Sequence, residues 1–246
     1  LEGAGFSVKV TDVRPQFTEI EAEFHGELYS HQKEAVSQIL SADFGVLKAP
    51  PGSGKTVMGC AAIASRKIPT LVIVHWDQLV SQWQEQIVKL LGIEKKKIGV
   101  YGGTRRKLKG YVDIAMVQSL SRCEDVKKML SGYGHIVVDE CHHIPAVTFE
   151  NILREASPRY VLGLSATPYR KDGLQKIMFV QCGPIRYELE ESDRYALNRT
   201  VVVKECGSSA PTIESKTLQL HEIWAKIASD AERQKLIASD VAQTIM

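Results

Sequence analysis

Residues 45–56 read Gly-Val-Leu-Lys-Ala-Pro-Pro-Gly-Ser-Gly-Lys-Thr, a short apolar run that leads directly into a glycine-rich loop. The run Gly45–Lys48 predicts a buried strand, and the sequence Val57–Ser65 after the loop predicts a helix. Glycines at this place let backbone N–H groups turn toward phosphate oxygens at the positive end of the helix dipole. We therefore expect a phosphate-binding loop, since a simple Gly/Pro turn with a capping Thr would need neither flanking element.

The last two residues of this loop have chemical roles of their own. The Lys55 ammonium is expected to reach the β- and γ-phosphates of ATP, and the Thr56 hydroxyl is expected to bind Mg²⁺. The strict pattern Gly-x-x-x-x-Gly-Lys-[Ser/Thr] fails only at its first position, which is Ala49. The loop residues expected to bind the nucleotide are Pro51, Gly52, Ser53, Gly54, Lys55 and Thr56.

Further strand-like runs alternate with helical patterns along the chain. The stretch Gln78–Leu91, for example, repeats Leu79, Trp83 and Ile87 at helical spacing. This alternation predicts an α/β P-loop domain with a mostly parallel sheet flanked by helices on both faces. In such sheets, ligands bind beyond the carboxyl ends of the strands. The other predicted strands are Thr70–His75, Ile98–Tyr101, Val112–Val117, His135–Asp139, Tyr160–Ser165 and Pro184–Leu189.

An acidic pair, Asp139-Glu140, closes one of these runs and is followed by Cys141-His142. An aspartate at the end of a buried strand is costly to desolvate unless it faces a cation. Mg²⁺ beside the phosphate loop would be that cation, and Glu140 could then orient or deprotonate the attacking water. Alone, the pair would also fit an ordinary strand end. Together with the loop it predicts Lys55, Asp139 and Glu140 as the catalytic residues.

The composition bounds the remaining possibilities. The 246 residues are 44% hydrophobic, and 31 basic residues nearly balance 29 acidic ones, so a nucleic-acid footprint has to be local. Five scattered cysteines fit a reducing compartment. Without an apolar run near ~18 residues or a secretory pattern, we expect a cytoplasmic (in a eukaryote, cytoplasmic or nuclear) protein that has no membrane partner and is not secreted. The N-terminus resembles a cut inside a longer protein.

Taken together, residues 28–190 resemble superfamily 2 helicases of the DEAH-like branch. Ala49–Thr56, Asp139–His142 and Ser165-Ala166-Thr167 match motifs I, II and III in order and spacing, and Leu28–Gln32 resembles the Q-type motif. The resemblance implies a RecA-like lobe that binds ATP and Mg²⁺. It further implies adenine contacts for Tyr29 and Gln32, and coupling of the ATP state to nucleic-acid binding by His142, Ser165 and Thr167.

Within that superfamily, Gly163–Gly173 looks most like the XPB-like DNA repair helicases and restriction-type translocases. This resemblance implies DNA as partner, duplex or single strand, held through its backbone. It also implies a second RecA-like lobe with an arginine finger worth ~10³–10⁵ in rate. Motifs IV to VI of that lobe are not found, so we expect this chain alone to be nearly inactive. No heptad seam is visible, so we also expect it to be monomeric. The expected organisation is an extension at 1–27, lobe 1 at 28–205, and a linker with a helical entry to the second lobe at 206–246.

A basic run is the local candidate for nucleic-acid binding. Seven cations lie within fifteen residues, in Lys95–Lys97 and in Arg105-Arg106-Lys107 with Lys109. The alternative, a solvated basic face, stays open. Trp76 and Trp83 could stack on bases, although core packing is the stronger interpretation of Trp83. The predicted nucleic-acid contacts are Gly102, Gly103, Thr104, Arg105, Gln118 and Ser119.

Two other functions compete with an ATP-driven DNA helicase or translocase. One is an RNA helicase or RNA-stimulated ATPase of the same superfamily, which the residues after motif III disfavour. The other is a nucleotide-gated binding module without motor activity, in which DNA would bind but would not accelerate ATP turnover.

Overall fold

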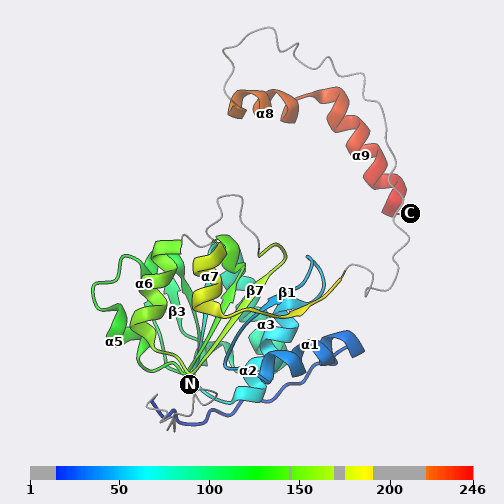
Figure 1. Cartoon of the computed structure of the whole chain (residues 1–246). Coiled ribbons are helices and arrows are strands. Elements are labelled where there is room, and N and C mark those ends of the chain that lie inside the picture. Colours follow the sequence, from blue (N-terminus) through cyan, green and yellow to red (C-terminus); the bar gives the residue numbers. More distant parts are fainter. Residues whose placement is uncertain (1–14, 144–145, 169–174, 191–219, 246) are drawn as a thin grey trace. The chain divides into compact units, whose positions relative to one another are not determined.

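The computed structural model describes residues 15–143, 146–168, 175–190 and 220–245. The chain divides into two compact units, residues 1–196 and residues 197–246 (Figure 1). The tail of the XPB-like motif, residues 169–173, and the first 14 residues lie outside the described part. No helix of the described residues is long and apolar enough to span a bilayer.

The first unit contains an eight-stranded sheet in the order β4-β3-β5-β2-β6-β7-β1-β8. All neighbouring pairs run parallel except β3 and β4. The prediction of a mostly parallel sheet is therefore confirmed. The strands are β1 Phe44–Lys48, β2 Thr70–Val74, β3 Val100–Gly102, β4 Arg105–Lys107, β5 Val112–Met116, β6 His135–Asp139, β7 Tyr160–Ser165 and β8 Ile185–Glu188.

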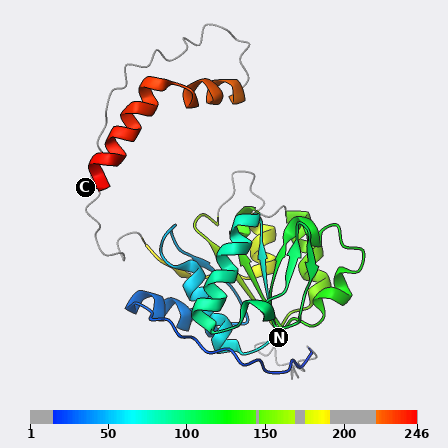
Figure 2. The ribbon, with the colours of Figure 1, turned by 180° about the vertical axis from the view of Figure 1, so that it is seen from behind.

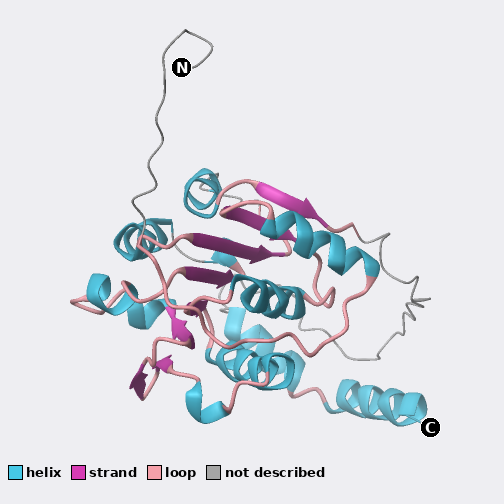
Figure 3. Ribbon diagram, turned by 90° about the horizontal axis from the view of Figure 1, so that it is seen from below, coloured by secondary structure: helices cyan, strands magenta, loops and turns pink. Residues whose placement is uncertain are grey.

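Helices cover both faces of this sheet, as the sequence predicts. Successive strand residues point to opposite faces, so Leu71 and Ile73 of β2 join one apolar cluster, while Val72 and Val74 join the other. Figure 3 shows helices on both sides of the sheet. Helices α1, α2 and α3 pack on the Val72 side, and α5, α6 and α7 pack on the Leu71 side (Figure 2). The helices and 3-10 turns are α1 Ser30–Leu40, α2 Lys55–Arg66, α3 Asp77–Leu91, η2 Lys95–Lys97, α4 Val117–Leu120, α5 Val126–Leu130, η3 Cys141–His143, α6 Ala146–Ala156 and α7 Gln175–Cys182.

The strand at the β4 edge was not predicted from the sequence. The expected strand Ile98–Tyr101 begins two residues later, at Val100, and turns back through Gly103-Thr104 into β4. Gly103 has φ 57°, the positive value that a two-residue hairpin turn requires at its first position. All three residues of β4 are basic and exposed, so they carry no alternation of apolar and polar residues that would indicate a strand.

The second unit is helical where it is described, as the sequence predicts after Leu218. It contains α8 Leu220–Ala228 and α9 Ala231–Ile245. Between them the Asp230 carboxylate accepts a hydrogen bond from the Arg233 backbone N–H at 3.0 Å. This contact satisfies one of the free N–H groups at the start of α9.

Candidate nucleotide and nucleic-acid sites

The predicted motifs lie in a row along the carboxyl edge of the sheet. Strands β5, β2, β6, β7 and β1 are successive neighbours. The segments leaving them carry, in the same order, Gln118, His75, the Asp139-Glu140 pair, Ser165 and the phosphate loop. Residues more than a hundred positions apart in sequence thus become neighbours in space, as expected for ligand sites in parallel α/β sheets.

The phosphate loop has the backbone shape that its glycines allow. Gly52 and Gly54 have φ values of 76° and 85°, and helix α2 begins directly afterwards, at Lys55. Ala49, at the position where the motif expects Gly, is fully buried, and its N–H donates to the Ser165 carbonyl at 2.9 Å. Its own carbonyl accepts from Lys55 Nζ at 3.1 Å. Alanine therefore fits this position because its contacts are made by the backbone.

Gln32 is attached to this loop from α1. Its Nε2 donates to the Ser53 carbonyl at 2.9 Å, and its Oε1 accepts from the Tyr29 N–H at 3.0 Å. A Cβ added at Gly54 would lie 2.6 Å from Gln32 Nε2. The buried amide is thus a brace for the loop, a contact that the sequence did not predict. The adenine contacts of Tyr29 and Gln32 stay a prediction.

The Asp139 carboxylate is buried and each of its oxygens has one donor. Oδ2 accepts from the Trp83 indole Nε1 at 2.8 Å, and Oδ1 accepts from the Glu140 N–H at 3.0 Å. Burial raises the pKa of Asp139, and the Trp83 N–H opposes that rise because it stabilises the carboxylate. Trp83 itself is fully buried, so the interpretation of this residue as part of the core is confirmed.

Glu140 occupies a left-handed backbone conformation with φ 48°. Such values are uncommon for residues other than glycine and cluster at functional sites. The Glu140 Oε1 lies 3.3 Å from Lys55 Nζ, and Oε2 lies 3.4 Å from His142 Nδ1. The candidate catalytic base is therefore held between the phosphate-loop lysine and the histidine of motif II.

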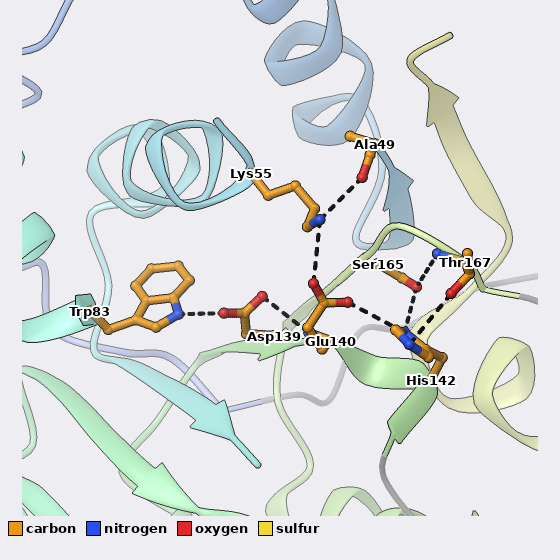
Figure 4. A network of polar contacts seen from close by, with 8 residues as sticks. All are labelled: Ala49, Lys55, Trp83, Asp139, Glu140, His142, Ser165 and Thr167. Carbon is orange, nitrogen blue, oxygen red and sulfur yellow. Dashed lines mark hydrogen bonds and ion pairs between the residues drawn. The ribbon is translucent and has the colours of Figure 1, made fainter. Parts of the chain in front are cut away.

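His142 joins the acidic pair to motif III (Figure 4). Its Nδ1 lies 2.8 Å from Ser165 Oγ, and its Nε2 lies 3.4 Å from Thr167 Oγ1. Ser165 Oγ also accepts from the Thr167 N–H at 3.1 Å. The three residues predicted to couple ATP state to nucleic acid form one hydrogen-bonded set that touches Glu140.

A hollow of about 380 Å³ is lined by most of the predicted phosphate-loop residues and by both predicted metal ligands, but not by Tyr29, Gln32 or Ser53. Lys55, Thr56, Asp139 and Glu140 all line it, and oxygen ligands from Thr and Asp are those that Mg²⁺ prefers. The sequence did not predict that one face of α3 would line it too. That face consists of Leu79, Gln82 and Gln86, and its signal was the spacing of three and four residues around Trp83.

A second hollow, of about 450 Å³, brings together all six predicted nucleic-acid contacts. Gly102, Gly103, Thr104 and Arg105 come from the β3–β4 hairpin, and Gln118 and Ser119 come from α4. Asp77, Arg106, Met116 and Arg122 complete the lining. Of these four, only Arg106 was named from the sequence, as part of the basic run.

Three of the predicted contacts are buried or already engaged within the protein. Ser119 is only 8% exposed. The Gln118 Nε2 donates to the His75 carbonyl at 2.9 Å, and Arg105 forms an ion pair with Asp77 at 3.0 Å. Arg105 therefore lies at the hollow with its charge partly neutralised.

The basic run does not form one face. Arg105 and Arg106 line the second hollow, whereas Lys96, Lys97 and Lys109 line a separate groove together with Glu19 and Glu21. Lys96 is paired with Glu94 at 2.7 Å. The lysines of this groove therefore lie beside acidic side chains and apart from Arg105 and Arg106.

Trp76 is 51% exposed beside this row of motifs. Its ring contacts His75 and His143, with ring centroids 5.3 and 5.2 Å away. His75 in turn lies 3.2 Å, through Nδ1, from Gln118 Nε2. Aromatic and polar contacts thus continue from the coupling residues toward the second hollow.

Comparisons with known sequences identify the family of this chain. A protein-family model described as "Type III restriction enzyme, res subunit" matches residues 25–170. The DNA 3'-5' translocase XPB2 of Sulfurisphaera tokodaii is 30% identical over 199 residues, which cover 75% of this chain and 44% of that protein. The DNA 3'-5' helicase XPB of Kineococcus radiotolerans is 33% identical over 227 residues, covering 88% of this chain and 40% of that protein.

A viral relative has a different described substrate. The putative ATP-dependent RNA helicase L396 of Acanthamoeba polyphaga mimivirus is 32% identical over 189 residues, covering 74% of this chain and 35% of that protein. The chain therefore spans less than half the length of these three relatives.

Two solved structures share the fold. The UvsW helicase of bacteriophage T4 superposes with a TM-score of 0.57 at 20% identity, covering 68% of this chain and 63% of that one. The Sulfolobus solfataricus SWI2/SNF2 ATPase core in complex with dsDNA superposes with a TM-score of 0.55 at 24% identity, covering 68% of this chain and 38% of that one. The chain belongs to the type III restriction enzyme res subunit family, and it contains a RecA-like superfamily 2 helicase lobe with XPB-like relatives.

Proposed function

We propose that this chain is the ATP-binding lobe of an ATP-dependent DNA helicase or translocase, in which Mg·ATP hydrolysis drives movement on DNA. The observation that carries the proposal is the contact of Lys55 with Glu140 at 3.3 Å inside a hollow that Thr56 and Asp139 also line. The proposed phosphate-binding lysine, the proposed metal ligands and the proposed base therefore lie close together. The printed names of the two XPB relatives support DNA as the track.

Each residue has a distinct part in the proposed reaction. Backbone N–H groups of the phosphate loop bind the phosphates, and Lys55 exchanges its contact with Glu140 for the β- and γ-phosphate oxygens. Thr56 and Asp139 hold Mg²⁺, which when bound neutralises charge developing on the transferred phosphoryl group. Glu140, released from Lys55, orients the attacking water and accepts its proton.

We infer that full turnover needs groups from beyond this lobe. The residues that line the hollow include no arginine among those that the structure describes. An arginine finger contributes ~10³–10⁵ in rate in related phosphoryl transfers. A second RecA-like lobe is the proposed source, and residues 206–246 are proposed as the linker and helical entry to it.

The hollow beside the β3–β4 hairpin is the proposed nucleic-acid site. Gly103, where no atom would lie within 4 Å of an added Cβ, lets a phosphate backbone approach closely. Gly102 lines the same hollow, but the Met116 side chain fills the space beside it. Arg105 and Arg106 provide charge. Contacts to the phosphate backbone do not distinguish bases, so binding should be independent of the nucleotide sequence and weakened by salt. RNA is the second candidate track, favoured by the printed name of the mimivirus relative.

The test is ATP turnover by the full-length protein that contains this lobe, measured without nucleic acid, with duplex DNA and with RNA of equal length. The proposal expects duplex DNA to accelerate turnover more than RNA does. Acceleration by RNA alone would establish the second candidate. Turnover that ignores both polymers would contradict the motor and favour a nucleotide-gated binding module.

A further inference from the structure

The indole of Trp83 connects α3 to the metal-binding carboxylate. Trp83 and Asp139 lie 56 positions apart in sequence, and both are buried. The indole N–H has a single hydrogen to donate, and it donates this to Asp139 Oδ2 at 2.8 Å. Removal of that donor would leave one oxygen of a buried carboxylate without its protein partner.

The neighbours of Trp83 fix the direction of this N–H. A Cβ added at Gly59 of α2 would lie 2.8 Å from Trp83 Cη2 and 3.3 Å from Leu164 Cδ1. The far end of the indole is therefore held between α2 and β7, in space that exists because residue 59 has no side chain. A ring packed this tightly keeps one rotamer, because interiors are close-packed and tolerate little displacement.

The two donors together define the plane of the Asp139 carboxylate. Trp83 Nε1 bonds Oδ2, and the Glu140 N–H bonds Oδ1 at 3.0 Å. Two ionised oxygens offer about four acceptor positions, so positions remain for a cation on the side of the hollow. In a free aspartate side chain the torsion about the Cβ–Cγ bond takes a broad range of values. In Asp139 the two hydrogen bonds restrict this torsion.

We propose that Trp83 is a positioning residue, which holds the Asp139 carboxylate in the orientation that binds the nucleotide's divalent cation. The inference rests on the proposed Mg·ATP site and adds α3 to it. Partners of metal ligands typically change metal affinity by about 10–100-fold when they are removed. The nucleotide itself is bound by the phosphate loop, so affinity measured without a divalent cation should be insensitive to Trp83.

The experiment uses this chain, a fluorescent ADP analogue, and Mn²⁺ as the cation that electron paramagnetic resonance can follow. Trp83→Phe should bind ADP in EDTA within about twofold of the wild type and bind Mn²⁺ about tenfold more weakly. Trp224→Phe, at an exposed position in the second unit, is the matched control and should leave both affinities unchanged.

A second variant separates the donor from the packing. Replacement of Trp83 by benzothienylalanine keeps the shape of the indole and exchanges its N–H for sulfur, so a loss of Mn²⁺ binding then isolates the hydrogen bond. Wild-type Mn²⁺ affinity in both variants, with loss in Asp139→Asn, would overturn the inference and leave the proposed function standing. Failure of the wild type to bind ADP both in EDTA and with Mn²⁺ present would overturn the proposed function and the inference with it.

Discussion

The nucleotide hollow and the nucleic-acid hollow share one edge of the sheet, yet their residues are held in different ways. In the nucleotide hollow, Lys55, Asp139 and Glu140 contact one another or buried partners such as Trp83. In the nucleic-acid hollow, Arg105 is held by an exposed pair with Asp77. Buried contacts of fixed geometry should respond sharply to single substitutions, whereas exposed charges should respond mainly to salt.

The difference matches the chemistry required of each site. Phosphoryl transfer depends on groups placed within a fraction of an ångström, which a bonded network provides. A motor that moves along a polymer needs contacts that form and break repeatedly. Exposed charges that exchange one anionic partner for another are suited to this.

Gly54→Ala should have the largest effect among substitutions that test this comparison. Gly54 has φ 85°, and the added methyl carbon would lie 2.6 Å from Gln32 Nε2. Strain and displacement of the buried amide together should lower the free energy of unfolding by about 2–4 kcal/mol and weaken ADP binding at least tenfold. Urea unfolding and ADP titration measure these effects. Gly132→Ala, at a position with open space, is the control, and equal behaviour of the two variants would contradict the prediction.

Gln32→Ala should have the next largest effect. It leaves the Tyr29 N–H and the Ser53 carbonyl without this partner, which costs about 1–3 kcal/mol for a buried group. Thermal unfolding without nucleotide measures the loss. Gln38→Ala on the exposed side of the same helix should be nearly neutral. A Gln32→Ala variant of wild-type stability that only binds adenine more weakly would show that Gln32 is a ligand and not a brace.

Both hollows can be compared only at pH values where the lobe stays folded, and the buried His135 should make its stability depend on pH. Burial lowers the pKa of His135 to about 3, with Arg66 adding to the effect. Between pH 6.5 and about 3, the unfolded chain therefore takes up a proton that the folded chain does not. Stability should fall as pH falls, by up to about 1.4 kcal/mol per pH unit from this residue.

The check is a set of urea-unfolding curves across that range. The free energy of unfolding should depend less steeply on pH in His135→Val than in the wild type. His25→Gln, at an exposed position, should keep the wild-type dependence. The same slope in His135→Val and wild type would assign the acid sensitivity to other groups.

Arg105→Ala tests the exposed hollow and should have the smallest effect. Loss of one phosphate contact should reduce the salt dependence of DNA binding by about 0.9 in the logarithmic slope. Lys96→Ala is the matched control, since Lys96 lines the separate groove and is paired with Glu94. Asp77→Asn should strengthen binding slightly, because it frees Arg105. DNA titrations at several salt concentrations measure these effects. An equal effect of Lys96→Ala would contradict the assignment and favour the lysine groove as the DNA-binding site.

Much of the nucleotide hollow could be predicted from the sequence because its groups lie in local patterns after strands. The phosphate loop, Asp139-Glu140 and Ser165 each follow an apolar run, and parallel strands bring such ends together. The contacts across the fold could not be predicted in this way. The helical spacing of Trp83 predicts a core residue, but its N–H could serve any acceptor, and only the packing of α3 on β2, β5 and α2 selects Asp139.

The nucleic-acid hollow was predicted less completely. The sequence predicts its glycines and Arg105 as contacts. It also suggests that the basic run forms one surface, whereas in the structure the run divides between two grooves. The reason is strand β4, which reverses the chain after Gly103 and takes Arg105 and Arg106 away from the lysines. The pairing of Arg105 with Asp77 also depends on where α3 begins.

The central claim is that Lys55, Asp139 and Glu140 form the catalytic site of a DNA-stimulated ATPase. It is tested most directly by Mg·ATP hydrolysis of the full-length protein with and without DNA, beside its Glu140→Gln variant. We predict acceleration by DNA in the wild type and a loss of about 10²–10⁴-fold in the variant, with nucleotide binding retained. Turnover that survives Glu140→Gln would contradict the assignment of the base, and turnover indifferent to DNA would contradict the motor.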